Sequence, residues 1–166
     1  MKILAIDPGS AESAWVVFET STSEIVGKGK RPNGFALQIF ERVDADRCVI
    51  EMIASYGMAV GASVFDTCVW IGRFAEAWDR REFDGELPAE FLFRKDVKLC
   101  LCGSMRAKYA NIRQAIIDRY PASGGGKNPQ VGTKKDPGPL YGVKADIWAA
   151  LGVAITASEL IEGATR

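Results

Sequence analysis

The stretch KILAIDPGSAESAWVVFE, residues 2–19, sets the expectation for the fold, because two apolar, strand-like runs flank the sequence Asp-Pro-Gly-Ser. The first run ends in Asp7, and aspartate is a poor strand former that is costly to bury without partners. Pro8 cannot donate a ladder hydrogen bond, and Gly9 allows a tight bend. We therefore expect Asp7 where a strand stops, either as a turn cap or as a carboxylate presented at the edge of a sheet.

Working outward from this stretch, apolar spacing predicts five strands and several helices along the chain. Strands are expected at 2–7, 12–20, 24–31, 47–53 and within 90–103, and helices within 32–45, 62–81, 105–120 and 143–163. The Gly/Pro/Lys-rich segment 121–142 is expected to hold no regular structure and to be either functional or disordered. The order predicts one α/β domain with a five-stranded mixed sheet, in which the first three strands are antiparallel.

Composition indicates an ordinary globular chain of 166 residues, of which 48% are hydrophobic and 25% charged. We expect no membrane partner, because no apolar run approaches the roughly 20 residues of a membrane span. The N-terminal residues show no secretory pattern, and the four cysteines form no C-x-x-C pair. These features predict reduced thiols and a cytoplasmic location.

The chain has no histidine, which excludes His-dependent triads, His-ligated zinc and His general bases. Its formal net charge is zero, but the charges are segregated along the sequence. Residues 94–144 carry 11 Lys or Arg against 3 Asp, and the rest carries 10 basic against 18 acidic residues. This distribution predicts a basic surface beside an acidic site, as in proteins that bind polyanions, although a merely solvated charged face is the simpler alternative.

Three acids interrupt apolar surroundings: Asp7 at the end of the first strand, Glu51 within CVIEMI, and Asp146 in the first turn of the last helix. Converging carboxylates repel one another and are tolerated mainly when a cation neutralises them. Oxygen ligands without His or Cys suit Mg²⁺ or Mn²⁺, and two such ions can drive phosphodiester hydrolysis. Each acid also has a simpler interpretation, as a turn cap, an edge-strand solvent residue or a helix N-terminal charge.

The motifs AIDPGS, VIEM and KAD ahead of AALGVAI resemble those of the RNase H-like superfamily. Within it, the chain resembles RuvC-type Holliday junction resolvases, especially bacteriophage members, over the longer segments 55–74, 101–120 and 133–154. The resemblance implies a single RNase H-like nuclease domain over 1–166 that acts as a homodimer on branched DNA. It also implies catalysis and binding of Mg²⁺, with two ions and Mn²⁺ as an alternative, by Asp7, Glu51 and Asp146.

The chain departs from its apparent relatives at three positions. Bacterial members have a fourth acid one helical turn after the third, where this chain has Ala149. Asp136 lies in the Gly/Pro/Lys-rich segment, where phage members often carry Asn, and Tyr109 stands where many of them have Asp. These departures leave the identity of a fourth metal ligand open.

Phosphate binding requires lysine and arginine gathered on one surface. The DNA-binding residues that we expect are basic, apart from one aromatic residue: Lys98, Arg106, Lys108, Arg113, Lys134, Lys135 and Tyr56. The aromatic residue is expected either as a structural side chain or as a platform for an unpaired base. In the helix expected at 62–81, we expect Phe65, Val69, Phe74 and Trp78 in the core, with enough further apolar surface for a dimer contact.

Other functions compete with a junction-cleaving nuclease. The sequence DPGS also satisfies the phosphate-loop pattern of the actin and hexokinase superfamily, but those proteins need two copies of the fold and 166 residues supply one. Ala149 and Tyr109 are compatible with a catalytically silent junction-binding protein. Flaps and RNA–DNA hybrids are alternative substrates, because an acidic site determines the chemistry and leaves the shape of the nucleic acid open.

Overall fold

The computed structural model describes residues 1–40, 42–55, 57, 59–81 and 87–164 of the chain. Its single sheet has five strands, in the spatial order β3-β2-β1-β4-β5. β1 pairs antiparallel with β2, which pairs antiparallel with β3, while β1–β4 and β4–β5 are parallel. The predicted mixed sheet with three antiparallel strands is confirmed. The strands are β1 (Lys2–Asp7), β2 (Glu12–Glu19), β3 (Glu24–Pro32), β4 (Arg47–Met52) and β5 (Glu90–Phe93).

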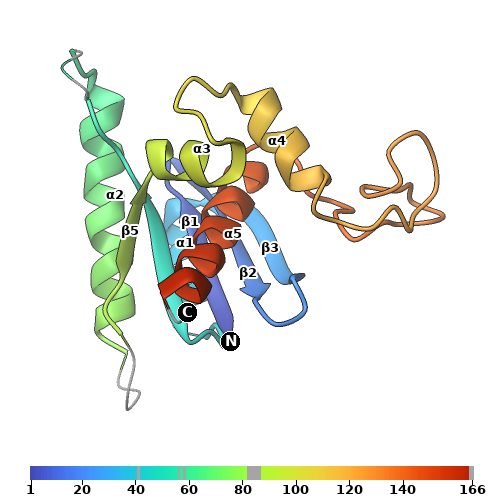
Figure 1. Cartoon of the computed structure of the whole chain (residues 1–166). Coiled ribbons are helices and arrows are strands. Elements are labelled where there is room, and N and C mark those ends of the chain that lie inside the picture. The colour runs from blue at the N-terminus through green and yellow to red at the C-terminus, as the bar shows by residue number, and fades with distance from the viewer. Residues whose placement is uncertain (41, 56, 58, 82–86, 165–166) are drawn as a thin grey trace.

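Helices cover both faces of this sheet (Figure 1). Side chains alternate between the faces along each strand, so neighbouring residues enter different cores. Ile3, Ala5 and Val49 belong to the core beneath α5, whereas Leu4, Ile6 and Ile50 belong to the core beneath α1 and α2. The helices are α1 (Asn33–Phe40), α2 (Ala62–Asp79), α3 (Arg94–Cys102), α4 (Tyr109–Ile117) and α5 (Ile147–Ala164).

The C-terminal helix α5 is the central helix of one core. Its 18 residues have a mean hydropathy of 1.3 and are long and apolar enough to cross a membrane, contrary to the expectation that no run approaches such a length. In the fold, 67% of this helix is buried. The apolar character of α5 is therefore explained by its packing against β1, β2 and α3.

The strand expected within 90–103 is much shorter than this range, because residues 94–102 form the helix α3. The backbone N–H of Phe93 donates to the Asp96 carboxylate at 3.0 Å, which fixes the first turn of the helix. Gly103, with φ of 64°, ends it in the left-handed conformation. Lys95 and Asp96 therefore lie in the first turn of a helix, and only the first four residues of the range 90–103 form the expected strand.

The core expected for α2 is only half correct. Phe74 and Trp78 are buried, with 0% and 1% exposure, but Phe65 and Val69 are 61% and 58% exposed. The buried side chains lie along one face of the helix, against the sheet and α1. Phe65 and Val69 lie on another face and remain available to a partner.

The segment 121–142 has no helix or strand, as expected, but backbone hydrogen bonds hold it together. Gly125 N–H donates to the Asp136 carbonyl, Gly138 N–H donates to Val131, and an isolated bridge joins Gly132 to Pro137. A Cβ at Gly132 would lie 2.1 Å from a backbone nitrogen, so the close approach requires glycine. The Gly/Pro pattern therefore encodes a specific folded loop.

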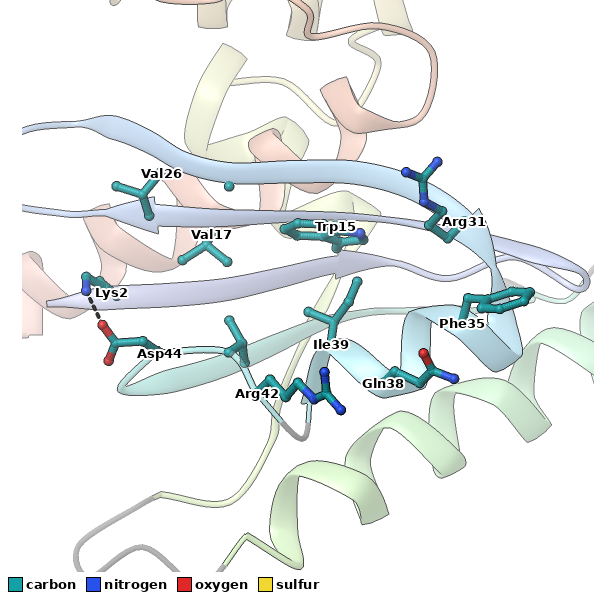
Figure 2. A pocket seen from close by; sticks show the side chains of 12 residues that line it. Lys2, Trp15, Val17, Val26, Arg31, Phe35, Gln38, Ile39, Arg42 and Asp44 are labelled. Atoms are coloured by element: carbon teal, nitrogen blue, oxygen red, sulfur yellow. Dashed lines mark hydrogen bonds and ion pairs between the residues drawn. The ribbon is translucent and has the colours of Figure 1, made fainter.

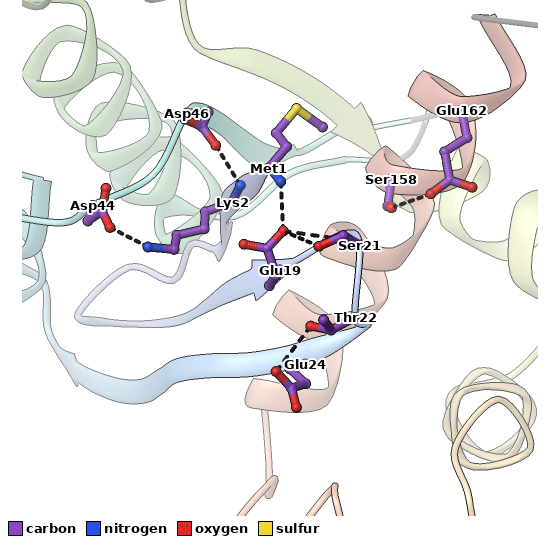
Figure 3. Close-up of polar contacts among 10 residues, drawn as sticks. All are labelled: Met1, Lys2, Glu19, Ser21, Thr22, Glu24, Asp44, Asp46, Ser158 and Glu162. Carbon is purple, nitrogen blue, oxygen red and sulfur yellow. Dashed lines mark hydrogen bonds and ion pairs between the residues drawn. The ribbon is translucent and has the colours of Figure 1, made fainter.

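The edge of the sheet where β1 begins is secured by exposed polar contacts (Figure 3). The N-terminal ammonium donates to Glu19 Oε1 at 2.6 Å, and the backbone N–H of Lys2 donates to Asp46 at 2.6 Å. The Lys2 ammonium also pairs with Asp44. Exposed pairs of this kind add little stability, so they mainly fix the register of β1 against its neighbours.

Candidate active site

Asp7 and Glu51 come together because β1 and β4 are adjacent and parallel. Ile6 pairs with Ile50, so the next residues of the two strands lie side by side. Asp7 lies two residues after Ala5, and Glu51 lies two residues after Val49; Ala5 and Val49 both belong to the core beneath α5. Because side chains alternate along a strand, the two acids point to this same face of the sheet. The parallel pairing thus places two carboxylates from distant parts of the sequence side by side, at the carboxyl-terminal ends of two inner strands of the sheet.

The turn after Asp7 is capped by other residues. Gly9 N–H donates to Ser13 Oγ at 3.2 Å, and the Asn33 amide donates to the Gly9 carbonyl at 2.9 Å. A Cβ at Gly9 would lie 2.4 Å from the Glu12 carbonyl oxygen, so the tight turn requires glycine. These contacts satisfy the turn without the Asp7 carboxylate, which weakens the turn-cap interpretation of Asp7.

The paired carboxylates are held in an unfavourable environment. Desolvation by burial is the main cause that raises the pKa of Asp7, and the same cause raises that of Glu51 still further. The negative charge of Asp7 adds to the rise for Glu51. Glu51 is only 7% exposed, and its Oε2 atom accepts no hydrogen bond from any described residue. A buried carboxylate oxygen without a donor is the kind of atom that a cation satisfies.

Arg94 is the nearest positive charge to this pair. Its Nε donates to Glu51 Oε1 at 2.8 Å, and its charge lowers the pKa of both carboxyls against the effect of burial. Arg94, Asp7 and Glu51 line one cavity of about 280 Å³, together with Pro8 and residues 52–54. The cavity provides room for a small ion or a phosphate oxygen beside the carboxylates.

Asp146 lies close enough for its charge to raise the pKa of Asp7, but its carboxylate is bound elsewhere. Its Oδ2 accepts from the Lys30 ammonium at 2.8 Å, and its side chain is 54% exposed. Among the residues that the structure describes, no three acidic or cysteine side chains converge on one point. The described site is thus a carboxylate pair, with a third acid held beside it by a lysine.

The backbone before Asp146 is strained and held in place. Ala145 has a φ of 45°, in the left-handed region that is unfavourable for alanine. The Tyr109 hydroxyl donates to the Ala145 carbonyl at 3.0 Å. Burial is the main cause that raises the pKa of this phenol, so it stays protonated and able to donate. Tyr109 therefore fixes the turn from which Asp146 projects.

Neither Asp136 nor the position of Ala149, where bacterial members have an acid, supplies a fourth ligand to this site. Ala149 is 3% exposed and packs in the core of α5, one turn beyond Asp146. Asp136 lies in the folded loop, where a Cβ on Gly125 would stand 2.9 Å from its carboxylate oxygen. Neither position adds an oxygen ligand to Asp7 and Glu51.

The basic residues predicted to contact DNA lie on α3, on α4, in the turn that joins these helices, and in the loop at 121–142, and Figure 1 shows both helices beyond the end of β5. Lys98, on α3, donates to the Met105 carbonyl at 3.4 Å, and Arg113, on α4, stacks over Trp148 at 4.9 Å. The remaining four are exposed, at Arg106, Lys108, Lys134 and Lys135. Tyr56 lies outside the described residues.

Sequence reasoning did not identify Lys30 and Arg94 as site residues. Lys30 pairs with Ala14 across the β2–β3 ladder, and Arg94 directly follows β5. Their role cannot be predicted from the sequence, because only the register of the sheet places each of them beside an acid that is remote in sequence. The alternating lysines of GKGKR were the one available signal, because Lys28 and Lys30 share a face.

The comparisons with known proteins identify the fold. No protein-family model and no curated protein matches the chain. The "Thermus thermophilus RuvC structure" superposes with a TM-score of 0.66 at 16% identity, covering 98% of this chain and 97% of that one. "T. thermophilus RuvC in complex with Holliday junction substrate" gives 0.64 at 16% identity, covering 98% and 96%. The five-stranded mixed sheet and its flanking helices are thus the RuvC-type, RNase H-like fold.

Proposed function

We propose that this chain is a divalent-metal-dependent endonuclease that cuts four-way and other branched DNA by phosphodiester hydrolysis. The observation that carries the proposal is the buried pair Asp7–Glu51, in which Glu51 Oε2 has no hydrogen-bond donor among the described residues and both residues line one cavity of a RuvC-type fold. The solved neighbour bound to a Holliday junction supports branched DNA as the substrate. DNA recombination, repair or phage DNA processing, in the cytoplasm of a bacterium or an infected host, is the proposed setting.

The donor set fits a hard cation, since it consists of two buried carboxyl groups whose ionised forms are disfavoured until a cation neutralises them. Asp7 and Glu51 would hold Mg²⁺ or Mn²⁺, and Asp146 would join them once it leaves Lys30. The bound ion supplies Lewis-acid stabilisation of the phosphate and lowers the pKa of an attacking water. Arg94 orients Glu51 and offers its remaining positive charge to the entering phosphate. We propose that the same acids would hold two such ions in each site.

The basic side chains of α3, α4 and the loop at 121–142 would bind the phosphates that flank the scissile bond. Arg106, Lys108 and Arg113 are exposed, in and just before α4, and α3 directly follows the parallel strand β5. Contacts of this kind position DNA without reading its sequence. The preference for a branch would then come from the shape of the substrate.

The function is tested by incubating the purified chain with four-way, flap, RNA–DNA hybrid and linear duplex substrates, each with Mg²⁺ or with EDTA. We expect Mg²⁺-dependent nicks in the four-way junction, because the carboxylates need a cation to act on a phosphate. Cutting confined to flaps or hybrids would support the proposed metal-dependent hydrolysis but would contradict the four-way junction as the substrate. Mg²⁺-dependent binding without cutting of any substrate would contradict the nuclease proposal.

We also propose that the chain acts as a homodimer through α2. Phe65 and Val69 are exposed on the helix face that points away from the sheet, and Val60 precedes them with 37% exposure. Large exposed apolar side chains on one helix face are typical of a protein interface. Two copies would also present two sites for the two strands that must be cut in a four-way junction.

Replacing Phe65 and Val69 together with Asp is expected to convert a dimer into a monomer, because buried charges at an apolar interface are costly. Light scattering after gel filtration measures the mass at micromolar concentration. Leu160→Asp is the matched control, since this residue is 51% exposed on α5. A wild-type chain with the mass of one copy, or an unchanged dimer in the α2 variant, would exclude this interface.

A further inference from the structure

A groove of about 690 Å³ lies on the face of the sheet opposite the carboxylates (Figure 2). Trp15 and Val17 of β2 and Val26 of β3 form its floor, and Phe35 and Gln38 of α1 form one wall. Its size is within the range of ligand-binding sites, and most of its floor is apolar. The carboxylate mechanism uses none of these residues.

The floor of the groove is a flat aromatic surface. The Trp15 indole lies over β3 because Gly27 and Gly29 carry no side chains at the facing positions. A Cβ at Gly27 would stand 3.2 Å from the ring, and one at Gly29 would stand 3.1 Å from Nε1. The indole is partly exposed, and Phe35, at the groove mouth, is 63% exposed. Two aromatic rings are therefore available for stacking.

The charged residues of the groove carry a net positive charge. Three basic residues and one acid line it, and the acid, Asp44, already pairs with Lys2. Arg31 and Arg42 are exposed, and neither pairs with an acid among the described residues. Figure 2 places them on opposite sides of the aromatic floor, Arg31 on β3 and Arg42 beyond α1. A ligand that complements this groove would carry planar rings that stack on its aromatic side chains and negative charges on either side that pair with the arginines.

Arg31, which lines the groove, lies at the same end of the sheet as Asp7, because β3 and β1 both run antiparallel to β2. Arg31 follows Lys30, the residue that binds Asp146, and the two side chains point to opposite faces of β3. β3 is also one of the two edge strands of the sheet. Adjacent residues at the end of this edge strand thus contact Asp146 on one face of the sheet and line the groove on the other.

We infer that this groove binds single-stranded nucleic acid, with bases stacked on Trp15 and Phe35 and phosphates held by Arg31 and Arg42. Stacking platforms combined with cations bind single strands with little sequence preference. An acidic peptide shares the charge requirement but does not need two flat rings. The inference concerns binding only, so it stands whether or not the carboxylates cut DNA.

The test measures fluorescence anisotropy of a labelled oligothymidylate of about ten nucleotides, at low salt and in EDTA, so that no cutting occurs. The variant Arg31→Gln/Phe35→Ser alters two exposed groove residues, and Arg80→Gln/Leu160→Ser is the matched control for charge and apolar surface. We expect the groove variant to bind about tenfold more weakly than the wild type, and the control to bind unchanged. Photocrosslinking of an iodouracil-containing oligonucleotide should map to Trp15 or Phe35.

Equal affinity of the groove variant and the control would overturn the inference. So would loss of binding to an acidic aromatic peptide in the groove variant while oligonucleotide binding stays unchanged. Nicking of branched DNA is assayed separately with Mg²⁺, so a failure of the nuclease proposal is distinguishable from a failure of the groove proposal.

Discussion

Asp7→Asn is expected to reduce the rate of junction nicking by at least about a thousandfold, because it removes a ligand charge from the pair that would hold the cation. Binding of the four-way junction should remain, since the basic residues of α3 and α4 are unchanged. The readout is a single-turnover nicking rate beside a gel-shift affinity. Asp118→Asn, on the exposed end of α4, serves as the control that removes a charge elsewhere.

The same substitution should stabilise the metal-free protein. Burial disfavours the ionised form of Asp7, so a neutral amide in its place relieves a cost on the order of 1 kcal/mol at neutral pH. A gain in stability together with loss of nicking is typical of a functional site, whereas a structural turn cap would lose stability when replaced. Retained nicking, or a clear loss of stability, would contradict the assignment of Asp7 to the site.

The stability of the metal-free protein should fall as the pH rises through the pKa values of Asp7 and Glu51. Burial raises the pKa of Asp7 from 3.8 to about 6 and that of Glu51 from 4.5 to about 8. Because the folded state binds protons more tightly than the unfolded state, this contribution to stability is complete below pH 4 and is lost between about pH 4 and pH 8. Thermal unfolding in EDTA across this range measures the effect against the Asp7→Asn/Glu51→Gln variant, in which it should be absent.

Mg²⁺ should reverse this loss at high pH, because it binds the ionised pair and competes with protons. At pH 8 and millimolar Mg²⁺, we expect the unfolding temperature of the wild type to rise by about 3 °C, which corresponds to about 1 kcal/mol. At pH 5, where the pair is protonated, the rise should be small. An equal rise at both pH values, or an equal rise in the double variant, would show that the ion acts elsewhere.

Much of the fold is predictable from alternation in the sequence. The run from Lys2 to Asp7 and the runs after it are regular enough to give the antiparallel meander and the later crossovers. The segment VKLCLC is ambiguous, because Val97, Leu99 and Leu101 alternate like a strand while Val97 and Leu101 also match a helix. The structure buries Val97 and Leu101 and leaves Leu99 46% exposed. The cap that Asp96 makes to Phe93 decides for the helix, and this contact is not evident from periodicity.

The acids of the site could be proposed from the sequence because they interrupt apolar runs. Glu51, for example, lies in a largely buried strand, where an unpaired carboxylate would be costly. Their neighbours were not predictable. Lys30 and Arg94 reach Asp146 and Glu51 only through strand register, and Tyr109 reaches Ala145 across 36 residues. In α2, apolar residues occur on more than one face, so the sequence does not determine whether Phe65 or Phe74 meets the sheet.

Diffraction from crystals soaked in Mn²⁺, with data collected at an energy sensitive to manganese, tests the proposed metal centre most directly. We predict anomalous density between the carboxylates of Asp7 and Glu51, with Asp146 turned from Lys30 toward the ion. Crystals that diffract well yet show no anomalous density there, with Arg94 and Lys30 still bound to the acids, would contradict the account.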